Sequence, residues 1–246
     1  MNINQIKGPM ANTYVINSEG LLLVVDVPRG GIRYVISYMT EILSLDPGNI
    51  VLVTCTHDDP DHSGGVLSLA GLTGAAAAFP DGAHNIFRKL RHNPLGLIFR
   101  PLTIVQELLR PRWWKMYVNP FRQKKYERRQ KKYGGRHLAR KARKVAPDYL
   151  LRHNDPLPGF PDWFVIHTPG HSWDSCCFFH PKTRTIITGD TVLGSMRKGA
   201  LILPSIYSNP WHRSDTITLL KELGPEHIYP GHGSSFHGSH LLDHFR

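Results

Sequence analysis

The sequence predicts a single α/β domain, and three observations support this prediction. The chain has 246 residues, a normal length for one layered α/β domain with its own core. Short apolar runs of β-strand character alternate with segments of helical spacing in both its N-terminal and its C-terminal part. Loops rich in histidine and aspartate follow several of the expected strands. We therefore treat residues 1–246 as one domain.

The N-terminal part begins with two expected strands joined by a turn at Ser18-Glu19-Gly20. After a break at 28–31, apolar residues recur at helical spacing, and the next run is β-branched and apolar, as in a buried strand. This part is expected to contain strands at 12–17, 21–27, 50–55 and 75–79, and helices at 32–45 and 66–72.

The C-terminal part repeats this alternation of strands and helices. Ser214 is a plausible N-cap for its helix, because a serine hydroxyl can accept a hydrogen bond from a free backbone N–H group. The expected elements are strands at 163–167, 175–180, 185–188 and 227–229, and a helix at 214–223.

A strongly basic segment separates the two parts, and we treat 85–157 as a mostly helical insertion. Residues 88–144 contain 19 lysines and arginines and two acids, a net charge of +17, whereas the rest of the chain carries −6. Such separation of charge indicates an anionic substrate or partner. Three roles are open for this segment: a solvated cap, a cap that attracts a small anionic substrate, and a surface for nucleic acid or an anionic membrane.

Composition also bears on the location of the protein. The chain has three cysteines, Cys55, Cys176 and Cys177, and such an odd, low count favours a reducing compartment over a disulfide framework. We expect all three to be buried apolar residues. The sequence shows no secretory signal at its start and no run of about 20 apolar residues. These features predict a soluble, cytoplasmic protein.

The strongest chemical signal is the loop His57-Asp58-Asp59-Pro60-Asp61-His62, directly after the expected strand at 50–55. On a loop, this spacing lets His57 and Asp59 point one way and Asp61 and His62 another, which suits two adjacent ions. Imidazole and carboxylate groups are ligands of zinc, iron and manganese. Gly64 and Gly65 allow the backbone to fold tightly beside such a site.

Three further residues of ligand type lie where expected strands end. His171 follows the strand at 163–167, Asp190 follows the strand at 185–188, and His232 follows the strand at 227–229. In each case a glycine immediately precedes the polar residue. Loops held by a rigid sheet are a common place for such ligands.

Together these motifs resemble those of the metallo-β-lactamase-fold hydrolases, and in particular the branch similar to hydroxyacylglutathione hydrolases. The resemblance covers residues 12–232 apart from the basic insertion. It implies a four-layer αββα sandwich with metal ions at one edge, between the two sheets. The motifs are His57-x-Asp59-x-Asp61-His62, Thr168-Pro169-Gly170-His171, Gly189-Asp190 and Pro230-Gly231-His232-Gly233.

The resemblance also implies a ligand set for two divalent ions. At the position of Asp59 the family usually has histidine. A carboxylate makes the site harder, which shifts its preference from zinc towards iron or manganese. We expect zinc first, with iron or manganese as alternatives. The implied ligands are His57, Asp59 and His171 for one ion, Asp61, His62 and His232 for the other, and Asp190 as a bridge.

Two such ions lower the pKa of a shared water from about 15.7 towards 7 and so supply hydroxide at neutral pH. Asp61 is expected to orient the hydroxide and to shuttle its proton. The leading hypothesis is hydrolysis of a thioester, ester or lactone carried by a small anionic substrate. One alternative is a metal-dependent phosphodiesterase or nuclease that uses the basic insertion. Another is a non-enzymatic binding protein, in which the substitution at Asp59 has removed metal binding.

Other histidines are expected to have no part in this chemistry. His167 and His227 lie in expected strands, and His212 lies near the start of the expected helix at 214–223. We interpret all three as packed or surface residues.

Overall fold

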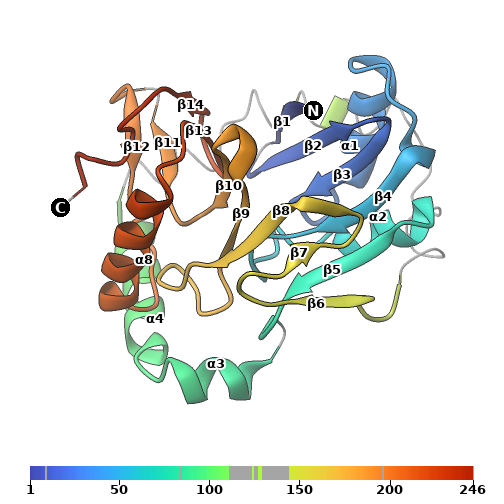
Figure 1. Ribbon diagram of the computed structural model, residues 1–246. Helices are drawn as coiled ribbons and strands as arrows, with labels where there is room; N and C mark the ends of the chain where they lie inside the picture. Colours follow the sequence, from blue (N-terminus) through green and yellow to red (C-terminus); the bar gives the residue numbers. More distant parts are fainter. Residues whose placement is uncertain are drawn as a thin grey trace. The chain divides into compact units, whose positions relative to one another are not determined.

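Two six-stranded sheets and a small hairpin form the framework of the protein in a computed structural model (Figure 1). The structure describes residues 1–8, 10–83, 85–110, 124, 127, 128, 144–195 and 197–245. The chain divides into two compact units, Met1–Phe79 with Trp114–Leu150 and Pro80–Trp113 with Leu151–Arg246. We call them unit one and unit two. The predicted mixed α/β class is confirmed. The assignment of 1–246 to one domain stays a prediction.

The first sheet has the strand order β1-β2-β3-β4-β5-β6. Its first three strands are antiparallel, and β3, β4 and β5 run parallel to one another. Glu19 and Gly20 both have positive φ in the turn between β2 and β3, as the predicted hairpin requires. The strands are β1 (Asn2–Lys7), β2 (Asn12–Ser18), β3 (Leu21–Val25), β4 (Ile50–Thr54), β5 (Ala76–Pro80) and β6 (Tyr149–Leu151).

Two helices and a 3-10 turn accompany these strands. Helix α1 (Ile32–Glu41) ends four residues before the predicted boundary, because Ser44 adopts a positive φ that cannot continue a helix. The 3-10 turn η1 (Pro47–Asn49) leads into β4, and the side chain of Asp46 caps it by accepting a hydrogen bond from the Gly48 N–H group at 2.8 Å. Helix α2 (Val66–Thr73) agrees with prediction and ends at Gly74, which has a left-handed conformation.

The second sheet has the strand order β14-β13-β10-β9-β8-β7. Only β10 and β13 pair in parallel, and their neighbours are antiparallel. The three cysteines are buried, as predicted. The strands are β7 (Pro156–Leu157), β8 (Phe160–His167), β9 (Cys176–His180), β10 (Thr185–Gly189), β13 (His227–Pro230) and β14 (Phe236–His237); the turn η2 (Pro181–Thr183) joins β9 to β10, and β11 (Leu193–Ser195) and β12 (Ala200–Ile202) form the hairpin.

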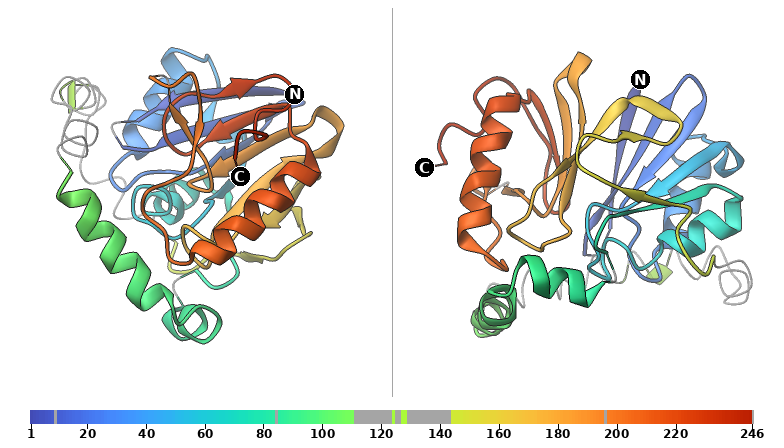
Figure 2. Two further views of the ribbon diagram at one scale, coloured as in Figure 1. Left: turned by 90° about the vertical axis from the view of Figure 1, so that its left-hand side faces the viewer. Right: turned by 60° about the horizontal axis from the view of Figure 1, so that its bottom comes forward.

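Helix α8 (Pro210–Leu223) covers the second sheet, as Figure 2 shows, and Ile217 and Leu220 pack in a core with Ile186 of β10. The predicted start of this helix at Ser214 is wrong. The N-cap is Asn209, whose side-chain oxygen accepts hydrogen bonds from the Trp211 and His212 N–H groups. Pro210 follows at the first helical position, where its missing N–H group has no energetic penalty.

The predicted insertion begins with two helices, α3 (Ile86–His92) and α4 (Gly96–Leu108), which follow one another in Figure 2. Strands β6 and β7 also fall within 85–157, and each pairs at an edge of a sheet. Within the basic segment at 88–144, residues 111–123, 125, 126 and 129–143 lie outside the described residues, so the predicted helical character of that stretch stays a prediction.

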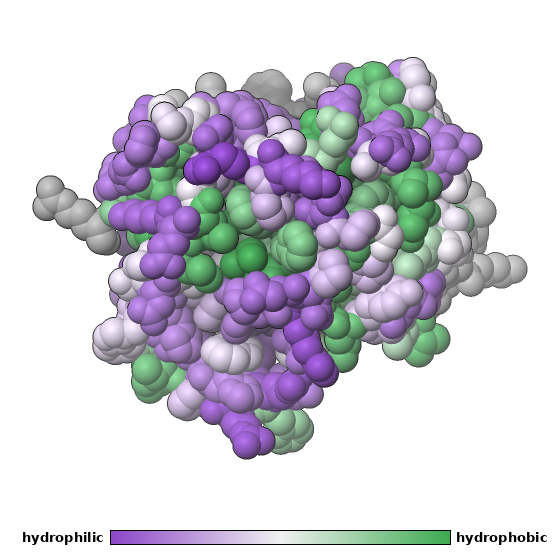
Figure 3. Space-filling view, in the orientation of Figure 1, coloured by the Kyte–Doolittle hydropathy of each residue, from purple (hydrophilic) through white to green (hydrophobic). Residues whose placement is uncertain are grey.

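The surface of α3 and α4 is unusually apolar. Phe87, Leu97, Ile98 and Leu109 are each more than 60% exposed. Hydrophobic side chains are visible among polar ones at the lower edge of Figure 3, where these helices lie. In the part of the chain that the structure describes, no helix combines the length and the apolar character needed to cross a bilayer.

Candidate metal centre

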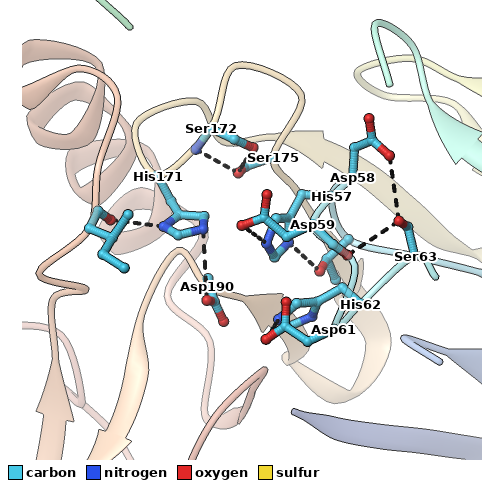
Figure 4. A network of polar contacts seen from close by, with 12 residues as sticks. His57, Asp58, Asp59, Asp61, His62, Ser63, His171, Ser172, Ser175 and Asp190 are labelled. Atoms are coloured by element: carbon cyan, nitrogen blue, oxygen red, sulfur yellow. Dashed lines mark hydrogen bonds and ion pairs between the residues drawn. The ribbon is translucent and has the colours of Figure 1, made fainter. Parts of the chain in front are cut away.

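The loop after β4 carries four of the predicted ligands, and all four lie in unit one. The Nε2 atom of His57 is 3.3 Å from Oδ2 of Asp59, and Nε2 of His62 is 3.8 Å from Oδ2 of Asp61. The two imidazole rings are 4.2 Å apart between centroids. Both histidines are buried, and Figure 4 shows the four side chains converging from this one loop.

The backbone of this loop is compact because its glycines allow a close approach. A Cβ atom on Gly64 would clash with the Pro60 carbonyl and the Arg29 side chain, and one on Gly65 would clash with Val27. The Val27 N–H group also donates to the His62 carbonyl at 2.7 Å. The predicted role of these two glycines is therefore confirmed.

Asp26, directly after β3, determines the proton position on His57 and His62, the two histidines of the loop after β4. Its fully buried carboxylate is 2.9 Å from Nδ1 of His62 and accepts hydrogen bonds from the N–H and hydroxyl groups of Thr56. A carboxylate only accepts, so Nδ1 of His62 carries the hydrogen. The Thr56 hydroxyl uses its proton on Asp26, so it must accept from Nδ1 of His57 at 3.1 Å. In the neutral rings both Nε2 atoms then keep a lone pair.

The other three predicted ligands converge in unit two. Nε2 of His171 is 3.8 Å from Oδ2 of Asp190, and Nε2 of His232 is 3.3 Å from the same oxygen. His171 follows β8, Asp190 follows β10 and His232 follows β13, so each of these residues lies in the loop after a strand, as predicted. All three are largely buried.

Hydrogen bonds hold these three loops in place. Nδ1 of His171 donates to the Ile206 carbonyl at 2.8 Å, so its Nε2 atom also keeps a lone pair. The guanidinium of Arg100, on α4, donates to the main-chain carbonyl of His171 at 2.8 Å. The Gly194 N–H group donates to the His232 carbonyl at 2.9 Å. Helix α4 thus supports a ligand loop directly.

The chemistry of these contacts fits a bound cation in each unit. A lone pair on Nε2 faces a carboxylate oxygen at His57, at His62 and at His171, and two acceptors repel each other at such distances. A divalent ion near both atoms would turn this repulsion into coordination, and Asp26, Thr56 and Ile206 supply the outer hydrogen bonds that orient ligating histidines. The carboxylate at Asp59 thus takes part in an arrangement of ligand type.

Sequence reasoning named the seven residues of ligand type, whose role as metal ligands stays a prediction, but it missed the residues that support them. Asp26 and Thr56 are 30 residues apart, and Arg100 is 71 residues from His171, so no local motif reveals these contacts. The division of the seven residues between two ions stays a prediction.

Comparison with known proteins identifies a family. The sequence model of the metallo-beta-lactamase superfamily matches residues 6–232, which include both sets of ligand-type residues. Among curated proteins, the chain is 36% identical over 70 residues to an atrochrysone carboxyl ACP thioesterase of Aspergillus fumigatus, and 36% identical over 73 residues to the lactamase-like protein GME11357 of Pestalotiopsis microspora. These matches cover 28% and 30% of this chain, and only 20% and 21% of the relatives' own lengths.

Solved structures share the fold. The metallo-beta-lactamase family protein TTHA1429 of Thermus thermophilus superposes with a TM-score of 0.61 at 16% identity, covering 98% of this chain and 76% of that one. TTHA1623 in a di-iron-bound form gives 0.56 at 19% identity, with 96% and 94% covered. The B3 metallo-beta-lactamase BLEG-1 gives 0.57, also at 19% identity and with 96% and 94% covered.

Proposed function

Because the chain belongs to the metallo-beta-lactamase superfamily, we propose that it is a dinuclear metal-dependent hydrolase of a thioester, ester or lactone. The observation that carries this proposal is the facing of imidazole Nε2 atoms and carboxylate oxygens in both units. Thioester hydrolysis is supported by the partial match to a thioesterase.

The seven ligand-type residues would bind two divalent ions, zinc, iron or manganese. When bound, such ions activate water and neutralise negative charge on the substrate oxygen. Asp61 would accept the proton of the attacking water, because its carboxylate is partly exposed beside His62. His57, His62 and His171 each have Nδ1 fixed by a hydrogen bond, which would leave Nε2 available to bind an ion.

A rate assay with separately reloaded metals tests the proposal. Metal-depleted protein is reloaded with zinc, iron or manganese and given a glutathione thioester, an acyl-coenzyme A, a lactone and a phosphodiester. We expect metal-dependent turnover of at least one carbonyl compound. Turnover of the phosphodiester alone would instead support the nuclease alternative, which the net charge of +17 between residues 88 and 144 favours.

The variant Asp190→Ala tests the site itself. We expect kcat/KM to fall by more than about a hundredfold, because loss of even an outer partner of a metal ligand costs about 10- to 100-fold. The control is Lys182→Ala, whose side chain is 71% exposed and pairs with Asp162 at the surface. Equal rates in the two variants would contradict the assigned site.

A further inference from the structure

Unit two contains a cavity of about 260 Å³ that the metal chemistry above does not use. Its wall includes the turn after β5, helix α3, the segment before β7, strand β8 and the loop between β8 and β9. Five of its lining residues are basic or imidazole-bearing: Arg88, His92, Arg152, His153 and His167. Asp81 is the one acid among the described lining residues.

The arginines give this cavity a surplus of positive charge. Arg88 pairs with Oδ1 of Asp81, and Nε of Arg152 is 3.5 Å from Oδ2 of the same carboxylate. The single carboxylate of Asp81 is therefore shared by two guanidinium groups. Each guanidinium is planar and has five N–H donors. Both arginines are substantially exposed, 47% for Arg88 and 72% for Arg152, so a ligand entering from solvent can reach them.

Aromatic and imidazole rings form the other side of the cavity around Trp173. The ring of His92 stacks on the indole at 5.1 Å, and the ring of His167 meets its edge at 5.0 Å. The Cδ1 atom of the indole lies 3.7 Å from the Cβ position of Gly82, so the tryptophan also packs against the turn that carries Asp81. Trp173 thus contacts both α3, through His92, and the turn that carries Asp81.

Two histidines of the cavity have defined hydrogen-bond partners. Burial lowers the pKa of His167, against a hydrogen bond of 2.6 Å to the Trp173 carbonyl that raises it. Nδ1 of His153 accepts a hydrogen bond from the His167 N–H group, so its ring proton lies on Nε2 as a donor. The permanent positive charge of the cavity comes from Arg88 and Arg152.

The cavity and the ligand His171 share one loop. His167 ends β8 four residues before His171, and Trp173 follows His171 by two residues. Lys89 of α3 pairs at 3.1 Å with Asp174, which is fully buried in the same loop. A group held in the cavity is therefore anchored next to a segment that positions a metal ligand.

We propose that this cavity binds an anionic group, a carboxylate or a phosphate, of the substrate that the enzyme hydrolyses. Guanidinium forks match the planar carboxylate and the phosphate oxygens, and the Nε2 donor of His153 adds a further N–H group at the site. The assignment to a substrate rests on the proposed hydrolase function, but anion binding can be measured without turnover.

The test is a titration of the full-length purified protein with inorganic phosphate and, separately, with acetate. The indole N–H signal of Trp173 in the NMR spectrum reports binding, and its assignment comes from Trp173→Phe. The double variant Arg88→Gln/Arg152→Gln removes both guanidinium groups. The control Lys182→Gln removes a positive charge from an exposed site in the same unit. Thermal unfolding verifies that each variant is folded.

We expect a saturable shift of the Trp173 signal, with affinity reduced roughly tenfold or more in the double variant and unchanged in the control. Tighter binding of phosphate would identify a phosphate group, and tighter binding of acetate a carboxylate. No saturable shift, or equal affinity in the double variant, would overturn the proposal. In turnover assays the double variant should have a higher KM than the wild-type protein for an acidic thioester but not for a neutral one. Its kcat should be unchanged. If phosphate or acetate binds as predicted and nothing is hydrolysed, the proposed function and the assignment to a substrate fail, and the anion site itself stands.

Discussion

Asp26 contacts both histidines of the ligand loop, directly at His62 and through the hydroxyl of Thr56 at His57. Asp26→Asn keeps the size of this side chain but replaces a charged acceptor with a weaker one and adds an N–H₂ donor. We expect the metal dissociation constant to rise by about 10- to 100-fold, as is usual when an outer partner of a ligating histidine is lost. Competition with a chromophoric chelator measures it.

The matched control for this prediction is Asp162→Asn, at an exposed position where the carboxylate pairs with Lys182 at the surface. Metal affinity should be unchanged there. If Asp26→Asn also retained wild-type affinity, the proton positions inferred for His57 and His62 would be wrong.

At the scale of single residues, the sequence was informative about ligands and uninformative about their supports. His57, Asp61 and His171 belong to short motifs in which residue type and spacing carry the chemistry. Thr56 and Arg100 have no such motif, because their roles depend on contacts between segments that only folding brings together. From its pattern alone, His167 was interpreted as a packed or surface residue. Its place in the wall of the cavity beside Trp173 is evident only from the three-dimensional structure.

At the scale of elements, Asn209 connects the start of α8 to α3. Its side-chain oxygen caps α8, its N–H₂ group donates to the Asn93 side chain at 3.1 Å, and its backbone N–H group donates to the Gly170 carbonyl beside His171. Asn209→Ala should lower the free energy of unfolding by about 1 kcal/mol or more, the usual cost of losing an N-cap. Urea denaturation measures the change.

Ser214→Ala is the control, because Ser214 lies exposed inside α8 rather than at its start. Its effect should stay within about 0.5 kcal/mol, as for most surface substitutions. A larger loss at Ser214 than at Asn209 would contradict the observed cap.

The boundaries of the strands and helices show where local sequence patterns were sufficient to predict the structure. Strong apolar runs predict β4 and β10 nearly at their observed positions, because burial on both faces leaves a clear signal. Strand β1 was missed, since Asn2–Lys7 is mostly polar and lies at a sheet edge. Helix α4 was not resolved from sequence because Pro101 interrupts its pattern, although the helix continues through this residue.

At the scale of the whole molecule, the α/β class followed from alternating strands and helices, and the family followed from motifs spread over both halves of the chain. The function of the basic segment did not follow, because charge alone does not distinguish a phosphate backbone from a small anion. The structure places α3 and α4 of this segment at the His171 loop and beside the cavity. This position favours a role in substrate binding.

The uneven charge of the molecule predicts a dependence of the reaction on ionic strength. Residues 88–144 carry a net charge of +17, which should attract an acidic thioester. Salt screens this attraction, and its range shrinks from about 30 Å at 0.01 M salt to about 10 Å at 0.1 M. We expect kcat/KM for this substrate to fall roughly tenfold over that range, and kcat/KM for a neutral ester to stay constant.

The double variant Lys124→Gln/Arg128→Gln, at two exposed positions, should make kcat/KM depend less on salt without changing kcat. Parallel salt profiles for both substrates measure this, and the same slope for the neutral and the acidic compound would show that the basic segment does not attract substrate.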